Sequence, residues 1–252
     1  MAKNLRRELE KIYALYNRRE YVSPDPLELL YRYKSVRDRE IAGLAASCFA
    51  YGNVRQIVRA GACALAVMGD SPRRYLEKTS PSALRRDFSG FRYRFTRGEE
   101  LSALLGAAKT IIKEYGWLGG CAAREMQRGF AARLRGAARG PVDTLIPSPG
   151  KGSALKRLNL FFRWMCRRDE VDPGGWDIAP SALIVPLDTH MNKIGRALGF
   201  TARAGAGMKT ALEITAGFAA LSPDDPVKYD FCLTRFGIRD GLDMEDLKRR
   251  LA

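Results

Sequence analysis

Hydrophobic residues recur at three- and four-residue steps along most of the chain, which is the period of an amphipathic helix. Near the N-terminus, for example, Leu5, Leu9 and Ile12 follow this spacing. The segments with this period are 3–16, 38–52, 54–69, 99–116 and 120–138. No segment alternates apolar and polar residues over a length that predicts a sheet. The pattern therefore predicts an all-α fold of short helices joined by turns rich in Gly, Pro and Ser.

One segment, residues 70–98, interrupts this helical pattern. It is rich in Arg, Ser and aromatic residues, and we interpret it as a linking region. The chain of 252 residues is long enough for one large domain or two small ones, and either can bury a substantial core.

Basic residues outnumber acidic ones, with 43 Lys and Arg against 28 Asp and Glu, giving a formal net charge of +15. Such a surplus favours a polyanionic partner, nucleic acid above all, because each phosphate neutralised by Lys or Arg releases condensed counterions. A basic surface without such a partner is the competing interpretation, since composition does not show where the charges lie.

Several classes of chemistry are excluded by composition. The five cysteines lack the spacing of zinc or iron–sulfur motifs, so we expect reduced, mostly buried thiols in a cytosolic protein. His190 is the only histidine, which rules out a His-rich metal cage. No apolar run approaches the roughly 20 residues that span a bilayer, so the sequence predicts a soluble intracellular protein without a membrane partner.

A first candidate element is the stretch "LIPSPGKGSALKRLNLFFRWMCR", residues 145–167, which begins with a Pro/Gly turn. Ser153 is a good N-cap, so a helix is predicted to open there. Gly150 and Gly152 can turn backbone N–H groups outward, and the helix dipole adds positive potential. The sequence therefore predicts a phosphate-binding corner. The basic residues beside it are Lys151, Lys156 and Arg157.

The second element surrounds Asp188, which follows a Gly/Pro-rich approach and precedes a helix carrying Met191 and Ile194. Two interpretations of Asp188 are open. As a helix N-cap, an aspartate at this position is physically sufficient. As a carboxylate at the mouth of a reaction site, it would also explain the basic, Gly-rich segments around it, and we favour this second interpretation.

The blocks "GSALKRLNLFFRWMCR", "LIVPLDTHMNKIGRALGF" and "DPVKYDFCLTRFGI" resemble the helix-hairpin-helix DNA glycosylases of the endonuclease III superfamily. There a hairpin is followed by a Gly/Pro-rich loop and an aspartate, commonly as Val-Asp-Thr-His, which Leu187-Asp188-Thr189-His190 matches. This likeness is strongest over 145–237. Over most of its length the chain also resembles a bacterial family with a domain of unknown function, marked by "GSAxKRLNxFLRWM" and "DPxKYDF" blocks.

The glycosylase resemblance implies a single helix-hairpin-helix glycosylase-like unit over residues 1–252, with two helical lobes and a cleft between them. One lobe would hold about 40–165, and the other 1–39 together with 166–252. The implied partner is duplex DNA with a damaged base, with no obligate protein partner. The implied location is the cytoplasm, in association with the nucleoid.

Two departures from that superfamily affect the site. The usual hairpin core Leu-Pro-Gly-Val-Gly-x-Lys-Thr-Ala is replaced by "SPGKGSALKRL", and Ala154 stands where the lysine is expected. The long interval between Lys156 and Asp188 is similar to that in archaeal 8-oxoguanine glycosylases, which makes Lys156 the candidate for the catalytic lysine. The C-terminal four-cysteine loop is absent, so no iron–sulfur cluster is implied, and a monovalent cation at the hairpin is the only ion expected.

The resemblance assigns Asp188 and Lys156 as catalytic residues. Asp188 would stabilise positive charge developing on the sugar, and a neutral Lys156 amine would attack C1′. The expected DNA contacts are Gly150, Lys151, Gly152, Ser153, Arg157 and His190. The expected base pocket is Phe162, Trp164, Trp176, Tyr229 and Asp230. Asp230 resembles the position from which some 8-oxoguanine glycosylases read the flipped base.

We therefore expect a DNA glycosylase for a damaged base, with an oxidised purine as the candidate lesion and strand nicking through Lys156. A non-catalytic nucleic-acid-binding protein on the same fold is the alternative, favoured by the altered hairpin. A protein-interaction scaffold is a third, supported only by the abundant arginine. For single residues, core packing of the aromatics and a solvated Lys156 or Asp230 are the competing interpretations.

Overall fold

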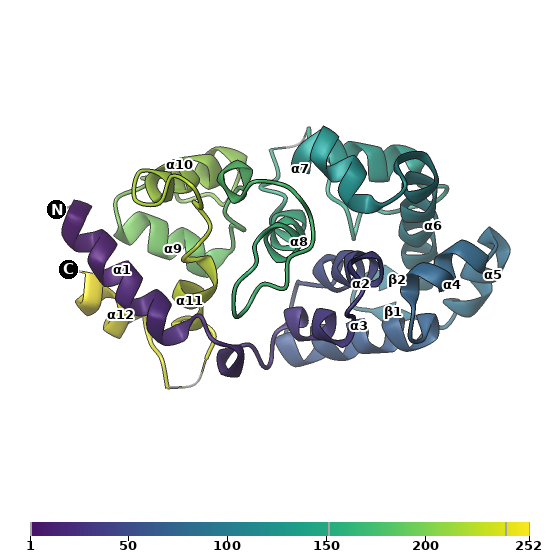
Figure 1. Cartoon of the computed structure of the whole chain (residues 1–252), viewed down its shortest axis with the longest axis horizontal. Helices are drawn as coiled ribbons and strands as arrows, with labels where there is room; N and C mark the ends of the chain where they lie inside the picture. The colour runs from purple at the N-terminus through teal and green to yellow at the C-terminus, as the bar shows by residue number, and fades with distance from the viewer. Residues whose placement is uncertain (1, 151, 240, 252) are drawn as a thin grey trace.

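The computed structural model describes residues 2–150, 152–239 and 241–251 of the chain, and this part is mainly helical (Figure 1). The α-helices are α1 (Ala2–Tyr16), α2 (Val36–Cys48), α3 (Val54–Met68), α4 (Pro72–Lys78), α5 (Pro81–Asp87), α6 (Gly98–Tyr115), α7 (Leu118–Ala137), α8 (Lys156–Cys166), α9 (Thr189–Ala197), α10 (Met208–Ala219), α11 (Asp230–Arg235) and α12 (Met244–Leu251). The 3₁₀ segments are η1 (Arg19–Tyr21), η2 (Pro26–Arg32) and η3 (Pro180–Ala182). Strands β1 (Arg92–Tyr93) and β2 (Thr96–Arg97) form one short antiparallel pair. The predicted all-α class is confirmed apart from this pair.

The interpretation of 70–98 as a linking region is wrong, because α4, α5 and the β1–β2 pair lie within it. Both helices begin with a Ser-Pro step that works as a start signal. The Ser71 hydroxyl accepts a hydrogen bond from an amide in the first turn of α4, and Ser80 does the same for α5. Proline follows each serine at the first helical position, where its missing N–H costs nothing.

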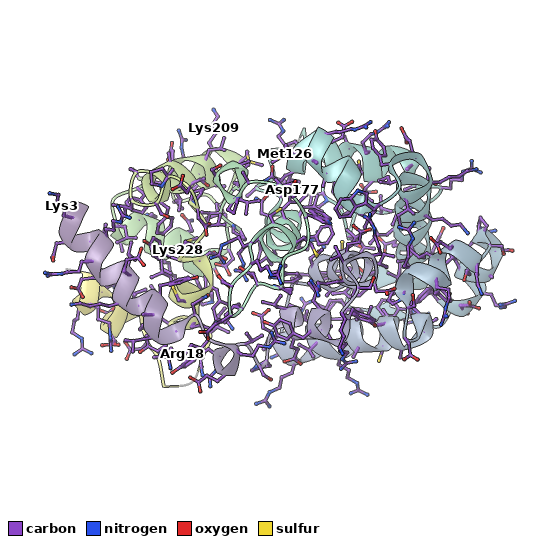
Figure 2. The ribbon with its side chains drawn as sticks, viewed as in Figure 1. Lys3, Arg18, Met126, Asp177, Lys209 and Lys228 are labelled. Atoms are coloured by element: carbon purple, nitrogen blue, oxygen red, sulfur yellow. The ribbon has the colours of Figure 1, made fainter. Side chains whose placement is uncertain are left out.

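The helices gather into two groups with α8 between them (Figure 1). The α2–α7 group includes η2, which packs against α2 and α3. The other group joins the two ends of the chain, because α1 contacts both α11 and α12, and α11 contacts α9. The proposed lobe boundaries stay a prediction, although η2, counted there with residues 1–39, packs with the first group. Lys3, Arg18 and Lys209 extend outward from the second group (Figure 2).

An aromatic cluster fixes α8 against the α2–α7 group. The Phe161 and Trp176 rings lie 4.8 Å apart, and Phe130 and Phe162 complete the cluster. The buried Glu40 carboxylate accepts hydrogen bonds from the Trp176 indole at 3.1 Å and from two amides in the first turn of α7. Burial raises the pKa of Glu40, and these donors oppose the shift. One face of α8 is therefore buried in the core.

A buried ionic chain ties α8 to the segment after it and to α11. The Arg163 guanidinium pairs with Asp230, and its Nε lies 3.3 Å from Asp172. Asp172 also pairs with Arg167, which reaches Asp225 at 2.8 Å. Burial disfavours the charged form of Arg163, but Asp172 and Asp230 outweigh this and raise its pKa. Because an unpaired charge in the interior is costly, this chain positions α8 and α11 relative to each other.

The five cysteines are free thiols, and all except Cys63 are buried, as the sequence predicts. Within the described residues, no helix has both the length and the apolar character needed to cross a membrane.

Candidate active site

A cavity of about 610 Å³ is lined by residues of both helix groups and of α8. Its walls come from α8, the loop between α2 and α3, the start of α9, and α11 with the residues after it. The α8 side chains that line it are Lys156, Leu160, Arg163 and Trp164. These positions follow the helical period, so the cavity takes the face of α8 opposite the aromatic cluster.

Asp188 lies at the wall of this cavity and is the N-cap of α9. Its Oδ1 accepts a hydrogen bond from the Met191 amide at 2.8 Å. The capping interpretation is therefore confirmed, and the helix holds this carboxylate rigidly. The interpretation as a carboxylate at a reaction site stays a prediction. Pro186, two residues earlier, lines the cavity as well.

Lys156 is the first residue of α8 and lines the same cavity as Asp188. Its amine lies 3.4 Å from the carbonyl oxygen of Ala50, in the loop after α2, and its side chain is half-buried. The predicted catalytic pair is thus brought to one cavity from elements far apart in sequence, with Lys156 and Asp188 on different walls.

Asp230 is only 3% exposed, yet it lines the cavity at the start of α11. Burial raises its pKa to about 6; the Arg163 charge opposes this shift and the Asp188 charge adds to it. One Asp230 oxygen pairs with Arg163, and the other, Oδ1, is buried without a hydrogen-bond partner among the described residues. Asp230 therefore retains an unused acceptor next to the cavity.

Two buried nitrogen donors at the cavity also lack hydrogen-bond partners among the described residues. The indole Nε1 of Trp164 and the Nε of Arg235 have no partner among the described residues, and both side chains line the cavity. Arg235 is held by Asp25 at 3.0 Å and stacks near the Phe231 ring. Because a buried polar group without a partner costs free energy, the cavity lining is suited to a ligand with complementary polar edges.

His190 follows Asp188 in the first turn of α9 and lines the cavity. Its ring packs against Gly237, where a Cβ would come within 2.0 Å of the His190 Nδ1. Only glycine leaves room for the imidazole at this point, so the chain after α11 sets where His190 lies.

The loop predicted to form a phosphate-binding corner has a different structure from the one expected. The helix opens at Lys156, not at Ser153, and Leu155 is the N-cap residue, with a left-handed backbone. Ser153 accepts a local hydrogen bond from the Leu155 amide, and Gly152 accepts one from the Met208 amide at 2.9 Å. The loop is therefore tied to the start of α10, and the prediction of Ser153 as N-cap is wrong.

The other residues expected to contact DNA are placed as follows. Gly150 and Gly152 are exposed on this loop, and neither lines the cavity. Lys151 lies outside the described residues. The Arg157 guanidinium donates to the carbonyl oxygens of Cys48, at 2.9 Å, and of Thr144. Arg157 thus joins α8 to the end of α2 and to the segment after α7 instead of extending to solvent.

Three of the predicted base-pocket residues do not line the cavity, which corrects that prediction. Phe162 and Trp176 belong to the aromatic cluster on the opposite face of α8. Tyr229 is fully buried against Tyr13, and its hydroxyl donates to Glu10. Their apolar surface is used for packing, so only Trp164 and Asp230 of the predicted pocket reach the cavity.

Sequence reasoning missed Arg163 and Arg235 as cavity residues. Each is a charged residue inside an otherwise apolar helical run, "FFRWM" and "FCLTRF". A buried arginine needs a buried partner, so this pattern was the available signal.

Among the described residues, no group of three or more His, Cys, Asp or Glu side chains could hold a metal ion. The monovalent cation expected at the hairpin stays a prediction.

A search of curated proteins and a search of solved structures found no match to this chain. A family model described as "Protein of unknown function (DUF2400)" matches residues 25–239, which contain the whole lining of the cavity. The chain belongs to this family of unknown function.

Proposed function

We propose that this protein is a DNA glycosylase that removes a damaged base and nicks the strand through Lys156. The observation that carries the proposal is the single cavity of about 610 Å³ lined by both Asp188 and Lys156. The volume lies in the range of pockets that enclose small ligands, roughly 300–1,000 Å³, so a flipped nucleobase with its sugar fits. In this proposal the fold is of the helix-hairpin-helix glycosylase type, with α8 between its two lobes.

The proposed reaction breaks the bond between C1′ and the base nitrogen, whose electron pair leaves with the base. Positive charge develops on the sugar as this bond weakens, and the nearby Asp188 carboxylate stabilises that charge. The Lys156 amine supplies the electron pair that forms the new bond to C1′. One of its protons passes to the departing base and the other to O4′, whose bond to C1′ breaks as the sugar ring opens to an imine.

Recognition of the base would fall to the polar atoms left without partners. Asp230 Oδ1 can accept from an N–H of the base, while the Trp164 and Arg235 nitrogens can donate to its oxygen or ring nitrogen atoms. An oxidised purine carries such donors and acceptors and remains our candidate lesion. The cost of extruding the base from the duplex, a few kcal/mol, is recovered through these contacts.

The proposed partner is duplex DNA, and the net charge of +15 supports it. The exposed glycines of the 147–155 loop would contact backbone phosphates, with His190 at the cavity adding a donor. The proposed location is the cytoplasm, in association with the nucleoid.

The decisive experiment incubates the protein with duplexes that carry oxidised or alkylated bases, in the presence of borohydride. Borohydride reduces an imine between protein and sugar to a stable amine, so a covalent adduct is expected with the wild type. Lys156→Gln should lose the adduct completely, because the amide cannot form the imine. Lys193→Gln, which removes an exposed lysine from α9 outside the cavity lining, is the matched control.

Base release without an adduct would assign a glycosylase that uses water and overturn the role of Lys156. The absence of base release from every lesion, with salt-sensitive DNA binding retained, would favour the alternative of a non-catalytic nucleic-acid-binding protein. The loop at Gly152 and Ser153, which pairs with Gly207 instead of opening a helix, is the observation behind this alternative.

The pH dependence of base release tests the role of Asp230. Because burial raises the pKa of Asp230 to about 6, it is protonated below this pH and becomes a charged acceptor above it. A charged acceptor binds an N–H more strongly, so kcat/KM should rise as pH increases through about 6. Asp230→Asn should remove this inflection. An unchanged profile in the variant would assign the titration to another group.

A further inference from the structure

The turn between β1 and β2 exposes an aromatic side chain that packing does not explain. Phe95 is 73% exposed, whereas the next most exposed large hydrophobic residue, Leu212, is 49% exposed. Its neighbour Arg94 has a φ of 49°, in the left-handed region that residues other than glycine adopt at a cost of about 1 kcal/mol. A strained turn that presents a phenyl ring to solvent indicates a use for that ring.

The hairpin is firmly anchored, so the position of Phe95 is defined. The Tyr51 hydroxyl bonds Thr96 Oγ1 at 2.8 Å, and the Tyr93 hydroxyl donates to the carbonyl oxygen of Tyr51. The Tyr51 and Tyr93 rings also pack, with centroids 5.0 Å apart. These bonds join both strands to the loop after α2 through the buried side chains of Tyr93 and Thr96, and the tip, Arg94 and Phe95, is exposed.

That loop is also a wall of the cavity, which places the tip beside the candidate active site. Tyr51 and Gly52 both line the cavity. Gly52 has a φ of +97°, and a Cβ on it would come within 2.8 Å of the Arg94 Nη1. The hairpin tip therefore stands next to the rim formed by Gly52.

The charge around Phe95 indicates the kind of partner. Arg92, Arg94 and Arg97 are all exposed on the same short hairpin, and the Arg94 guanidinium lies 5.7 Å from the Phe95 ring. An exposed aromatic ring surrounded by cations matches nucleic acid, in which bases offer stacking faces and phosphates offer negative charge. A purely apolar protein partner would leave the three guanidinium groups without counter-charges.

We propose that Phe95 is a wedge that enters the base stack of duplex DNA beside the nucleotide taken into the cavity, while the hairpin arginines contact the flanking phosphates. Apolar side chains inserted between base steps offset part of the cost of unstacking them. This proposal rests on DNA being the substrate, but it does not require Asp188 or Lys156 to be catalytic.

The test measures binding to a duplex that carries a tetrahydrofuran abasic-site analogue next to 2-aminopurine. The comparison is the same duplex with an ordinary nucleotide in place of the analogue. The Asp188→Asn background slows base release, so that the duplexes stay intact during the measurement. Stacking of Phe95 should change the 2-aminopurine fluorescence. Phe95→Ala should weaken binding to the abasic duplex about tenfold and abolish the fluorescence change. Phe95→Trp should retain both, because it keeps an aromatic face.

Leu212→Ala is the matched control, since it removes an exposed hydrophobic side chain from α10, and it should change neither signal. Equal binding by wild type and Phe95→Ala, with unchanged fluorescence, would overturn the wedge even where the enzyme releases bases. Loss of binding in Phe95→Ala without any base release by the wild type would support the wedge and reject the glycosylase. The two proposals therefore fail separately.

Discussion

Asp188→Asn is expected to lower the rate of base release at least about 100-fold while leaving the free energy of unfolding nearly unchanged. Asparagine is as good an N-cap as aspartate, so its side-chain oxygen keeps the hydrogen bond from the Met191 amide. The substitution removes only the negative charge, which is what the developing charge on the sugar requires. Single-turnover base release and urea denaturation of the same variant measure the two effects.

The comparison with two other variants separates capping from catalysis. Asp188→Ala should lose both activity and about 1 kcal/mol of stability, because the cap disappears with the carboxylate. Asp177→Asn removes an exposed carboxylate outside the cavity lining (Figure 2) and should change neither quantity. If Asp188→Asn released bases at the wild-type rate, Asp188 would be a cap and nothing more.

The sequence predicted the helices and the capping position of Asp188 because both follow from local patterns. Helical period and a capping aspartate are properties of a few neighbouring residues, and they survive into the structure at α9. Sequence likeness then paired Asp188 with Lys156, and the structure places both on one cavity. Whether they act together is what the borohydride experiment decides.

The sequence predictions were wrong where tertiary contacts, and not local patterns, determine the position of a side chain or the start of an element. On α8, Phe162 and Trp164 are both apolar aromatics in the same run, and only packing against Phe130 and Trp176 decides which one faces the core cluster. The start of α8 shifted to Lys156 because Ser153 pairs with Gly207 and Gly152 bonds the Met208 amide, contacts that local propensity cannot reveal. The β1–β2 hairpin was missed because two-residue strands carry no detectable alternation.

Arg163→Met should destabilise the protein by about 3–5 kcal/mol at neutral pH, the range for breaking a buried ion pair by removing one partner. Arg163 is 3% exposed and pairs with Asp230 and Asp172, so both carboxylates would lose their shared cation in the interior. Arg203→Met removes a partner of Glu213 at 2.7 Å in an exposed pair and should cost far less, because solvent screens this pair.

The dependence of this destabilisation on pH and on Asp230 distinguishes an electrostatic cause from a simple loss of packing. Without Arg163, the pKa of Asp230 rises further above its value of about 6, so the folded variant binds a proton that the wild type has released at neutral pH. The difference in unfolding free energy between the wild type and Arg163→Met should therefore be smaller at pH 5 than at pH 7, because at the lower pH Asp230 is protonated in both proteins.

Adding Asp230→Asn to Arg163→Met should recover part of the lost stability, since the amide carries no charge to leave unpaired. Urea denaturation of the single and double variants at both pH values measures this, and an equal loss at both pH values without recovery in the double variant would assign the effect of Arg163 to packing alone.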